Sequence, residues 1–375
     1  WADENQRFYV ANYEQLLRDF AHINQREWDL IIADEATKIS SPVAKQSKLI
    51  KKLRAKRRIA ATGTPISNRA NELWSILDFT NPGVFGNYWA FVERYCMKNQ
   101  WGGVFGYQNI EELSARVKRY MIRRLKKDVL TELPEMIITD VPFPLSEEER
   151  TFYDRLKKEI LFEIDQTDIS KLEQPMTIQY TLVRMARLRQ AANSMELLGE
   201  NTKSSKIELI KELLAQILSD NMEISQKNKV ILFSEFAEFC KILHRELVNY
   251  QPAMVIGETS LHKREEELMR FKTDPNCRVL ISSSAGAFGL NLTEANYILH
   301  ADQPWSLAKK QQREGRAHRM GQKKSVQIFN LLAEKTVDYY IKKVLHDKAG
   351  ISAKVLGDDK ITMNAIKEIL QYEGA

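Results

Sequence analysis

The amino-acid sequence predicts an α/β protein with two parallel-sheet parts separated by a helical region. Three observations predict it: apolar runs typical of buried strands alternate with helical stripes near the start of the chain, the alternation disappears in the middle, and it returns after residue 204. The 375 residues are too many for one ordinary core. No apolar run approaches the roughly 18 residues that a membrane-spanning helix needs.

In the first part, residues 30–33 (LIIA) form a continuous apolar run, as expected of a strand that is buried on both faces. The run ends in the acidic pair Asp34 and Glu35. Residues 58–61 (RIAA) predict a second buried strand, followed by a sharp loop at residues 62–65 (TGTP). Ligands bind at the carboxyl ends of the strands in open parallel sheets, so this edge is a candidate site.

The strand rhythm is absent from residues 71–201. Residues 147–164 predict a helix, whereas the prolines in residues 139–145 exclude a helix and predict an extended linker. The alternation then resumes. The expected strands are residues 229–233, 278–282, 296–301 and 325–331, and the expected helices are residues 207–218 and 235–249.

The net charge is +6, and basic residues gather in residues 48–58, 116–127 and 309–324. Each stretch is either a contact surface for a polyanion or a solvated helix face. The three cysteines form no CxxC pair, which disfavours a disulfide framework and a cysteine-rich zinc site. Together with the absence of a charged-then-apolar leader, this composition is typical of an intracellular protein.

Two segments carry residue types suited to phosphate chemistry. One carboxylate of the Asp34 and Glu35 pair can hold Mg²⁺ while the other orients a water molecule, although a solvated strand end is the alternative. The TGTP loop is either a phosphate sensor or a plain turn.

Residues 311–322 (QQREGRAHRMGQ) are the most distinctive stretch in the chain. Arg316 and Arg319 lie three apart, which predicts that both occupy one face of a helix. Two neighbouring guanidinium groups require an anion such as phosphate between them, unless this is a basic surface helix. Residues 282–293 (SSSAGAFGLNLT) predict either a loop of exposed N–H groups for phosphates or a flexible loop.

These segments occur in one order, and together they resemble the Swi/Snf-like group of superfamily-two helicases, which are DNA translocases and chromatin-remodelling ATPases. The resembling segments are residues 30–40 (motif II), 58–68 (motif III), 71–96 (the helical signature that follows), 121–156 (the connector), 229–236 (motif IV) and 278–322 (motifs V and VI).

The resemblance implies two RecA-like lobes with ATP bound in the cleft between them. The implied domains are residues 1–80 for the carboxyl-terminal part of lobe 1, 81–203 for a helical insertion and connector, 204–345 for lobe 2 and 346–375 for a helical extension.

The resemblance also implies roles for individual residues. Asp34 would hold Mg²⁺ through water, and Glu35 would activate the attacking water. Arg316 and Arg319 would be arginine fingers. The other implied residues are Gln312 and Gly289 near the nucleotide, Thr64, Ser234, Ser283 and Trp305 on the DNA side, and Thr37, Thr62 and Gly63 in coupling the ATP site to the DNA.

The sequence departs from the family pattern in two places. Thr37 stands where the family usually has histidine, so coupling is expected to differ. The motif G-x-x-x-x-G-K-[ST] is absent, so the phosphate-cradling loop is expected in a lobe 1 segment upstream of Trp1. This chain alone is therefore not expected to hydrolyse ATP efficiently.

Three functions remain open: an ATP-dependent translocase on double-stranded DNA, a non-catalytic DNA-binding or regulatory module with the same fold, and a strand-separating helicase. The retained carboxylates and arginines favour the first function, and the helical block after motif III favours translocation without unwinding. The expected partners are duplex DNA, the upstream lobe 1 segment and a DNA-bound protein target, with no membrane. A prokaryotic cytoplasm or nucleoid is favoured over a eukaryotic nucleus.

Overall fold

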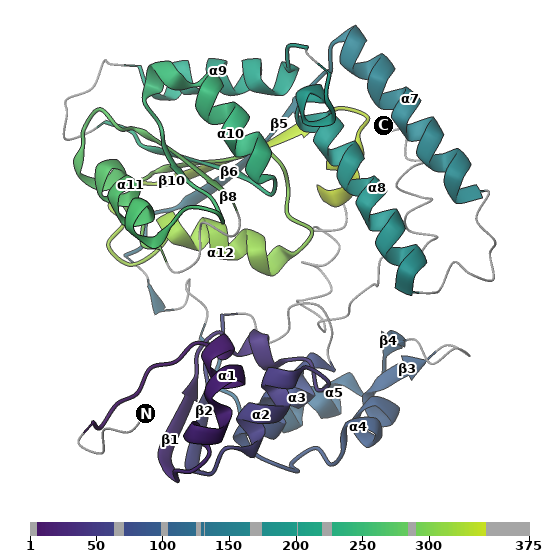
Figure 1. Ribbon diagram of the computed structural model, residues 1–375, viewed down its shortest axis with the longest axis vertical. Helices are drawn as coiled ribbons and strands as arrows, with labels where there is room; N and C mark the ends of the chain where they lie inside the picture. The colour runs from purple at the N-terminus through teal and green to yellow at the C-terminus, as the bar shows by residue number, and fades with distance from the viewer. Residues whose placement is uncertain are drawn as a thin grey trace. The chain divides into compact units, whose positions relative to one another are not determined.

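The computed structural model describes residues 6–63, 71–98, 104–124, 129–130, 132–165, 175–200, 202–219, 227–283 and 290–342 (Figure 1). The described chain divides into two compact units, the first ending at Arg124 and the second beginning beyond it.

The first unit contains a two-stranded parallel sheet. Strand β1 (Trp28–Ala33) pairs with β2 (Ala55–Ala60). A second, antiparallel pair joins β3 (Cys96–Lys98) to β4 (Val104–Tyr107). The helices of this unit are α1 (Tyr13–Ile23), the short 3₁₀ helix η1 (Ala36–Ile39), α2 (Lys45–Lys52), α3 (Glu72–Thr80), α4 (Tyr88–Tyr95) and α5 (Ile110–Val117).

Among the described residues, the parallel sheet of the first unit is covered on one face only. Helices α1, α2 and α3 pack with the strands in one core cluster that includes Ile50 and Phe79. On the strands, Leu30, Ile32 and Ile59 are 42%, 60% and 49% exposed. The prediction of strands buried on both faces is therefore wrong here, because successive side chains of a strand point to opposite faces and no described element covers the second face.

The second unit contains a six-stranded parallel sheet in the order β5-β10-β9-β6-β8-β7. Its strands are β5 (Met136–Phe143), β6 (Val230–Ser234), β7 (Ala253–Val255), β8 (Val279–Ser283), β9 (Tyr297–His300) and β10 (Val326–Ala333). Its helices are α7 (Glu147–Asp165), α8 (Pro175–Asn193), η3 (Met195–Leu198), α9 (Ser205–Ile217), α10 (Ala237–Glu246), η5 (Val248–Tyr250), α11 (Leu261–Thr273) and α12 (Leu307–Ala317).

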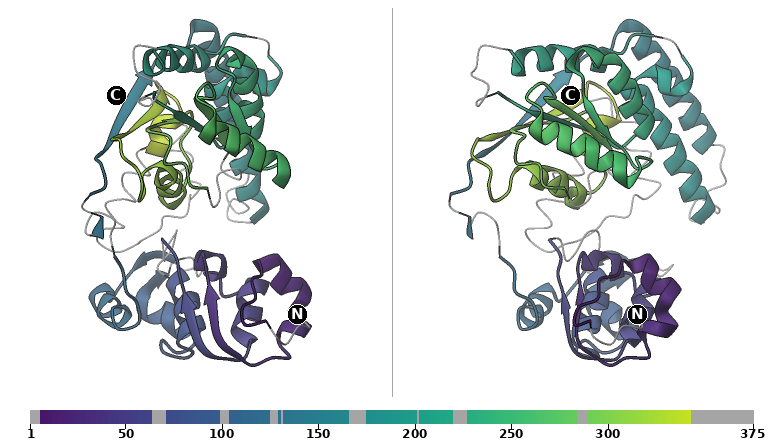
Figure 2. Two further views of the ribbon diagram at one scale, coloured as in Figure 1. Left: turned by 90° about the vertical axis from the view of Figure 1, so that its left-hand side faces the viewer. Right: turned by 60° about the vertical axis from the view of Figure 1, so that its left-hand side comes forward.

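Helices cover both faces of this larger sheet (Figures 1 and 2). Val230 and Leu232 of β6 belong to the core cluster with α7, α8, α9 and α10, whereas Ile231 and Phe233 belong to the cluster with α11 and α12. Every side chain of β6 is buried. The α/β architecture, the helix at α7 and the four strands expected after residue 204 are therefore confirmed.

The segment expected to be an extended linker is a strand at the edge of the larger sheet. Strand β5 pairs with β10 from Met136↔Val326 to Phe143↔Ala333. The expected extended conformation is confirmed, but the segment belongs to the sheet. Pro142 donates no N–H group, and an edge strand tolerates this because one side of its ladder has no neighbour.

Glu149 joins the starts of α7 and α9. Its carboxylate is 2% exposed and accepts hydrogen bonds from the N–H groups of Ser146 and Ser205, both at 3.0 Å, and from the Ser205 hydroxyl. A negative charge stabilises the N-terminus of a helix, and here one carboxylate serves two helices.

We expect Glu149→Ala to lower the free energy of unfolding of the second unit by about 2–4 kcal/mol, because it removes a shared cap and buried hydrogen bonds to a charged group. Urea unfolding of the full chain, followed by hydrogen exchange of the β6 amides, measures this loss. The matched control is Glu148→Ala, since Glu148 is exposed, and we expect a change within about 0.5 kcal/mol. Equal losses in both variants would contradict the shared-cap role.

Candidate functional site

The predicted carboxylate pair of the first unit lies at the carboxyl end of β1. Asp34 is exposed and Glu35 is half-buried. The Glu35 N–H donates to the Asp34 carboxylate at 2.9 Å, and the Glu35 backbone has the left-handed φ of 47°. This conformation is uncommon for residues other than glycine, and such strained residues cluster at functional sites.

The ends of β1 and β2 lie side by side at this edge. Main-chain hydrogen bonds of 2.9 Å join Ala61 to both Ala33 and Ala36. Thr62 and Gly63, which follow β2, are thereby brought next to the carboxylate pair. Thr64 lies outside the described residues.

Two hydroxyl groups hold the backbone of the carboxylate pair. The Tyr13 hydroxyl donates to the Asp34 carbonyl at 2.7 Å, and the Thr37 hydroxyl donates to the Glu35 carbonyl at 3.5 Å. Burial, together with the charges of Asp34 and Glu35, raises the pKa of Tyr13 to about 12. The edge therefore combines negative charge with access to solvent.

This arrangement fits Mg²⁺ in its usual protein setting. Mg²⁺ is bound through one or two carboxylates and keeps several waters, so the exposed Asp34 carboxylate is a suitable ligand or water-mediated ligand. Within the described ranges, no group of three or more His, Cys, Asp or Glu side chains could hold a metal ion.

In the second unit, predicted residues gather at the carboxyl ends of neighbouring strands. Ser234 ends β6 and Ser283 ends β8, and their Cα atoms are register partners. Trp305 follows β9 and is half-buried, with the Arg189 guanidinium 5.4 Å from the centre of its ring. Gly289 lies outside the described residues.

Asp302, to which the sequence analysis gave no role, is the central acceptor at this edge. Its carboxylate is fully buried. It accepts hydrogen bonds from the Ser234 hydroxyl, the Glu235 N–H (2.8 Å), the Asn193 amide (3.0 Å) and the Arg189 guanidinium (3.5 Å). The Ser234 side chain is therefore buried and bonded to Asp302, and its DNA-side role stays a prediction.

The network around Asp302 continues in two directions. The side-chain amide oxygen of Asn193 accepts a hydrogen bond from Lys206 at 2.7 Å, and Lys206, which is fully buried, pairs with Asp338 at 3.0 Å. On the other side, the half-buried Glu235 forms an ion pair with the buried Arg313 of α12. A continuous chain of buried and half-buried polar groups therefore runs from Asp338 to α12, the helix whose last turn carries Arg316.

The two predicted fingers do not share a helix. Arg316 is in the last turn of α12, which ends at Ala317, and Arg319 lies beyond that end. The prediction of one helix face is wrong because the chain turns: the Arg319 N–H donates to the Ala317 carbonyl at 3.1 Å, and Gly321 adopts a left-handed φ of 96°. Arg316, Arg319 and Gln312 are all half-buried.

A buried histidine–glutamate pair links β9 to α12. His300 Nε2 lies 3.7 Å from a carboxylate oxygen of Glu314, and the His300 ring stacks on Phe233. Burial lowers the pKa of His300 to about 4, so the ring is neutral at pH 7. Burial also lowers the pKa of Lys310 on the same helix.

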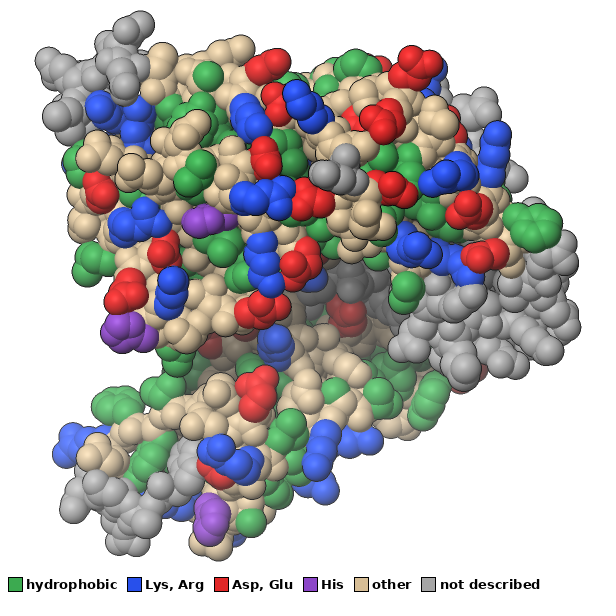
Figure 3. All heavy atoms as spheres, turned by 45° about the horizontal axis from the view of Figure 1, so that its top comes forward, with side chains coloured by type: hydrophobic (Ala, Val, Ile, Leu, Met, Phe, Trp, Pro, Cys, Tyr) green, Lys and Arg blue, Asp and Glu red, His purple; other side chains and the backbone are tan. Residues whose placement is uncertain are grey.

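Some basic side chains in the three basic stretches have acidic partners. Lys51 pairs with Asp78 at 3.0 Å, and Arg116 lies 3.6 Å from Glu112. On the face drawn in Figure 3, basic and acidic side chains are interspersed, and neither sign forms one broad patch. The surface that would bind a polyanion is therefore not identified by net charge alone.

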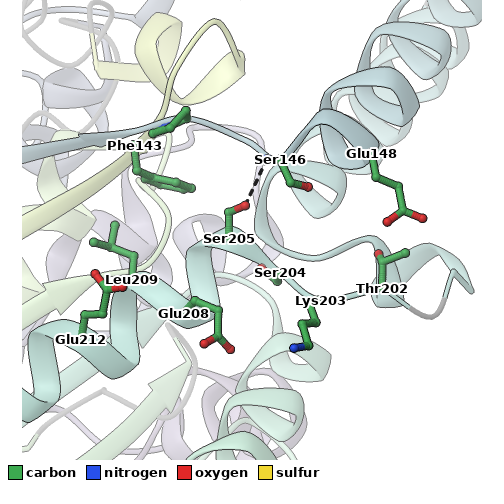
Figure 4. Close-up of a pocket in the computed structure, with 11 residues that line it drawn as sticks. Phe143, Ser146, Glu148, Thr202, Lys203, Ser204, Ser205, Glu208, Leu209 and Glu212 are labelled. Carbon is green, nitrogen blue, oxygen red and sulfur yellow. Dashed lines mark hydrogen bonds between the residues drawn. The ribbon is translucent and has the colours of Figure 1, made fainter.

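A surface pocket of the second unit lies away from the predicted motifs. It is located between Phe143 and the first residues of α7 and α9, where the Ser146 N–H donates to the Ser205 hydroxyl at 3.1 Å (Figure 4). Glu208 and Glu212 are among its lining residues, and these carboxylates disfavour a phosphate. None of the predicted site residues lines it.

Two protein-family models match the chain. A model of the SNF2-related domain matches residues 3–197, and a model of the helicase conserved C-terminal domain matches residues 205–321. No helix in the described part of the chain is both long enough and apolar enough to cross a membrane.

Relatives are found in bacteria and in humans. An uncharacterized ATP-dependent helicase of Mycoplasma genitalium is 29% identical, and the match covers 93% of this chain and 33% of the relative. The human SWI/SNF-related matrix-associated actin-dependent regulator of chromatin subfamily A member 1 is 27% identical, and the match covers 88% of this chain and 32% of the relative. The chain thus spans about a third of the length of these curated relatives.

One solved structure is similar in both sequence and fold. The SWI2/SNF2 ATPase core of Sulfolobus solfataricus, in complex with double-stranded DNA, is 30% identical with a TM-score of 0.51. The match covers 95% of this chain and 75% of that one.

Proposed function

The chain belongs to the SNF2-related family of ATP-dependent helicases, and on that premise we propose that it is the motor part of an enzyme that hydrolyses ATP to move along double-stranded DNA. The observation that carries this proposal is the 30% identity to the Sulfolobus core in complex with double-stranded DNA, in a match that covers 95% of the chain. The two α/β units are the two RecA-like lobes.

The first lobe supplies the carboxylates of the proposed ATP site. Asp34 would hold Mg²⁺ through water, and this ion, when bound, neutralises negative charge on the phosphate oxygens. Glu35 orients the attacking water and accepts its proton. The solvent access at Asp34 and the left-handed backbone at Glu35 support these roles. Thr37, Thr62 and Gly63 couple this edge to the DNA.

The second lobe supplies positive charge to the transition state. Arg316 and Arg319 would stabilise the negative charge that develops on the transferred phosphoryl group, as arginine fingers do in nucleotide hydrolases. Gln312 and Gly289 would lie near the nucleotide. Arg316 in the last turn of α12 and Arg319 two residues beyond the end of that helix lie close together in the chain, which supports a shared target.

Duplex DNA would be bound mainly through its phosphates, with Thr64, Ser234, Ser283 and Trp305 on the DNA side. We further propose that the moving motor acts on a DNA-bound protein. Such an enzyme is expected where the DNA is, in the cytoplasm or nucleoid of a prokaryote or in a eukaryotic nucleus.

The proposed ATP site also needs a phosphate-binding loop with its lysine, and the 375 residues contain no such motif. We therefore propose that the chain hydrolyses ATP efficiently only when a further lobe 1 segment supplies the loop. The exposed Leu30, Ile32 and Ile59 support this proposal, because a further segment that packs on this face of the sheet would cover them.

The test measures ATP hydrolysis by this chain and by a version extended upstream through a phosphate-binding loop, each with and without linear duplex DNA. We expect hydrolysis only by the extended version with DNA, and DNA binding that weakens steeply as salt concentration rises, because counterions are released from the phosphates. An extended protein that binds duplex DNA and never hydrolyses ATP would support the non-catalytic module instead. ATP-driven separation of the two strands would support the helicase.

A further inference from the structure

Gln322 closes the turn that carries Arg319. Its side chain is buried, with the residue only 7% exposed. The Gln322 N–H donates to the Arg319 carbonyl at 3.0 Å, and its side-chain amide donates to the carbonyl of Ala317, the last residue of α12, at 3.2 Å. Gly321 has a left-handed backbone, which lets the chain turn so that Gln322 reaches back to Arg319 and Ala317.

The same amide also holds a second segment. It donates to the Ala295 carbonyl at 2.8 Å and to the Thr293 carbonyl at 3.1 Å. A main-chain bond of 3.0 Å from the Leu292 N–H to the Arg316 carbonyl fastens this segment to the end of α12. One side chain therefore connects residues 293–295 to the end of α12, which carries Arg316, and to the turn that carries Arg319.

The acceptor end of the Gln322 side chain is used as well. Its oxygen accepts from the N–H groups of Lys323 and Lys324, both at 2.9 Å, where the chain leads into β10. Both ends of the amide are therefore bonded, and the two side-chain hydrogens are shared among three carbonyl groups. Such a fully bonded buried amide fixes the local backbone.

Arg319 depends on this backbone for its position. Among the described residues, the Arg319 guanidinium makes no hydrogen bond or ion pair, and only its main-chain atoms are bonded. We propose that Gln322 is the positioning residue for the Arg319 finger: it fixes the turn whose geometry aims the guanidinium. This inference rests on the proposed function.

The first measurement is the kinetics of Gln322→Met in the extended protein with duplex DNA. Methionine keeps the length of the side chain and removes the amide. We expect kcat to fall by about 10²-fold, the effect of misplacing a catalytic group by roughly 1 Å. We expect KM for ATP and the affinity for DNA to stay within about twofold, because the finger acts in the transition state. An unchanged kcat would overturn the proposal.

A double-mutant cycle separates positioning from general structural damage. In an Arg319→Ala background, Gln322→Met is expected to lower kcat no further, because the group that it positions is already gone. An equal additional loss in both backgrounds would overturn the proposal, since a merely structural residue affects every background alike.

A further variant tests the individual hydrogen bonds of the Gln322 side chain. Gln322→Glu keeps the acceptor for Lys323 and Lys324 but sets a carboxylate against three carbonyl groups, so we expect a loss at least as large as for methionine. A normal rate in Gln322→Glu would overturn the proposal. Gln327→Met is the matched control, because Gln327 is half-buried in β10 and its side chain makes no hydrogen bond with described residues.

Hydrogen exchange provides a readout that does not depend on catalysis. Gln322→Met should speed exchange at the amides of residues 322–324, while exchange in β6 stays slow and shows that the unit is folded. Unchanged exchange at residues 322–324 would overturn the anchoring. If the unsubstituted extended protein hydrolyses no ATP, the proposed function itself fails, and this is seen before any substitution is made.

Discussion

Replacing Arg319 with alanine is expected to lower DNA-stimulated ATP hydrolysis by about 10³- to 10⁵-fold in a protein that also contains the phosphate-binding loop. The residue is half-buried in the turn after α12, with its guanidinium unpaired among described residues and therefore available to a phosphate. Single-turnover kinetics at saturating ATP and duplex DNA measure the chemical step directly. KM for ATP should change little, because the finger stabilises developing charge rather than bound substrate.

Four companion variants test whether the loss is specific to the arginine fingers. Arg319→Lys keeps the charge but not the planar fork, so we expect only partial recovery. Arg316→Ala should cause a loss of similar size, and the double variant should lose far less than the product of the two, because the fingers act as a unit. Arg187→Ala is the matched control, since Arg187 is exposed on α8. A rate that falls less than tenfold in Arg319→Ala would contradict the finger role.

Lys206→Met is expected to destabilise the second unit by about 3–5 kcal/mol, the cost of leaving one partner of a buried ion pair uncompensated. Lys206 is fully buried, 3.0 Å from Asp338 and 2.7 Å from the Asn193 amide oxygen. The loss in free energy of unfolding is measured by hydrogen exchange of the β6 amides in the full chain over a range of urea concentrations.

The partner substitution tests the cause of that loss. Adding Asp338→Asn to Lys206→Met removes the unpaired buried charge. The asparagine keeps an acceptor for the Ala333 N–H, which in the unsubstituted chain donates to the Asp338 carboxylate at 3.3 Å. We expect the double variant to recover more than half of the loss. Lys203→Met, at an exposed position before α9, should change stability by no more than about 0.5 kcal/mol. No recovery in the double variant would show that the loss comes from packing and not from charge.

The fold of the second unit could be predicted largely from local patterns. The run of residues 230–233 is apolar throughout because β6 is buried on both faces, and such runs identify central parallel strands. β7 has only three residues, directly after Pro252, and so leaves no readable pattern. β5 resembled a linker because its proline, Pro142, is tolerated only through the edge position of the strand, which no local pattern reveals.

The candidate site was predictable where it depends on chain direction and not where it depends on distant contacts. Parallel pairing puts the strand ends together, so Glu35 and Thr62 could be expected at one edge. Asp302 is bonded to Ser234 and Asn193, which are 68 and 109 residues away in the chain, and no local pattern records those contacts. The turn at Arg319 was not predicted because the helical spacing of Arg316 and Arg319 holds only while the helix continues, and α12 ends at Ala317.

One face of the β1–β2 sheet is uncovered among the described residues, so this chain should self-associate more as its concentration rises. Leu30, Ile32 and Ile59 present apolar surface beside two strands that each have one unpaired edge within the described residues. Surfaces of this kind attract identical copies, and in a cell they attract chaperones and proteases. The 375 residues should therefore be handled dilute, and co-expression with a segment that covers this face should raise the yield of monomer.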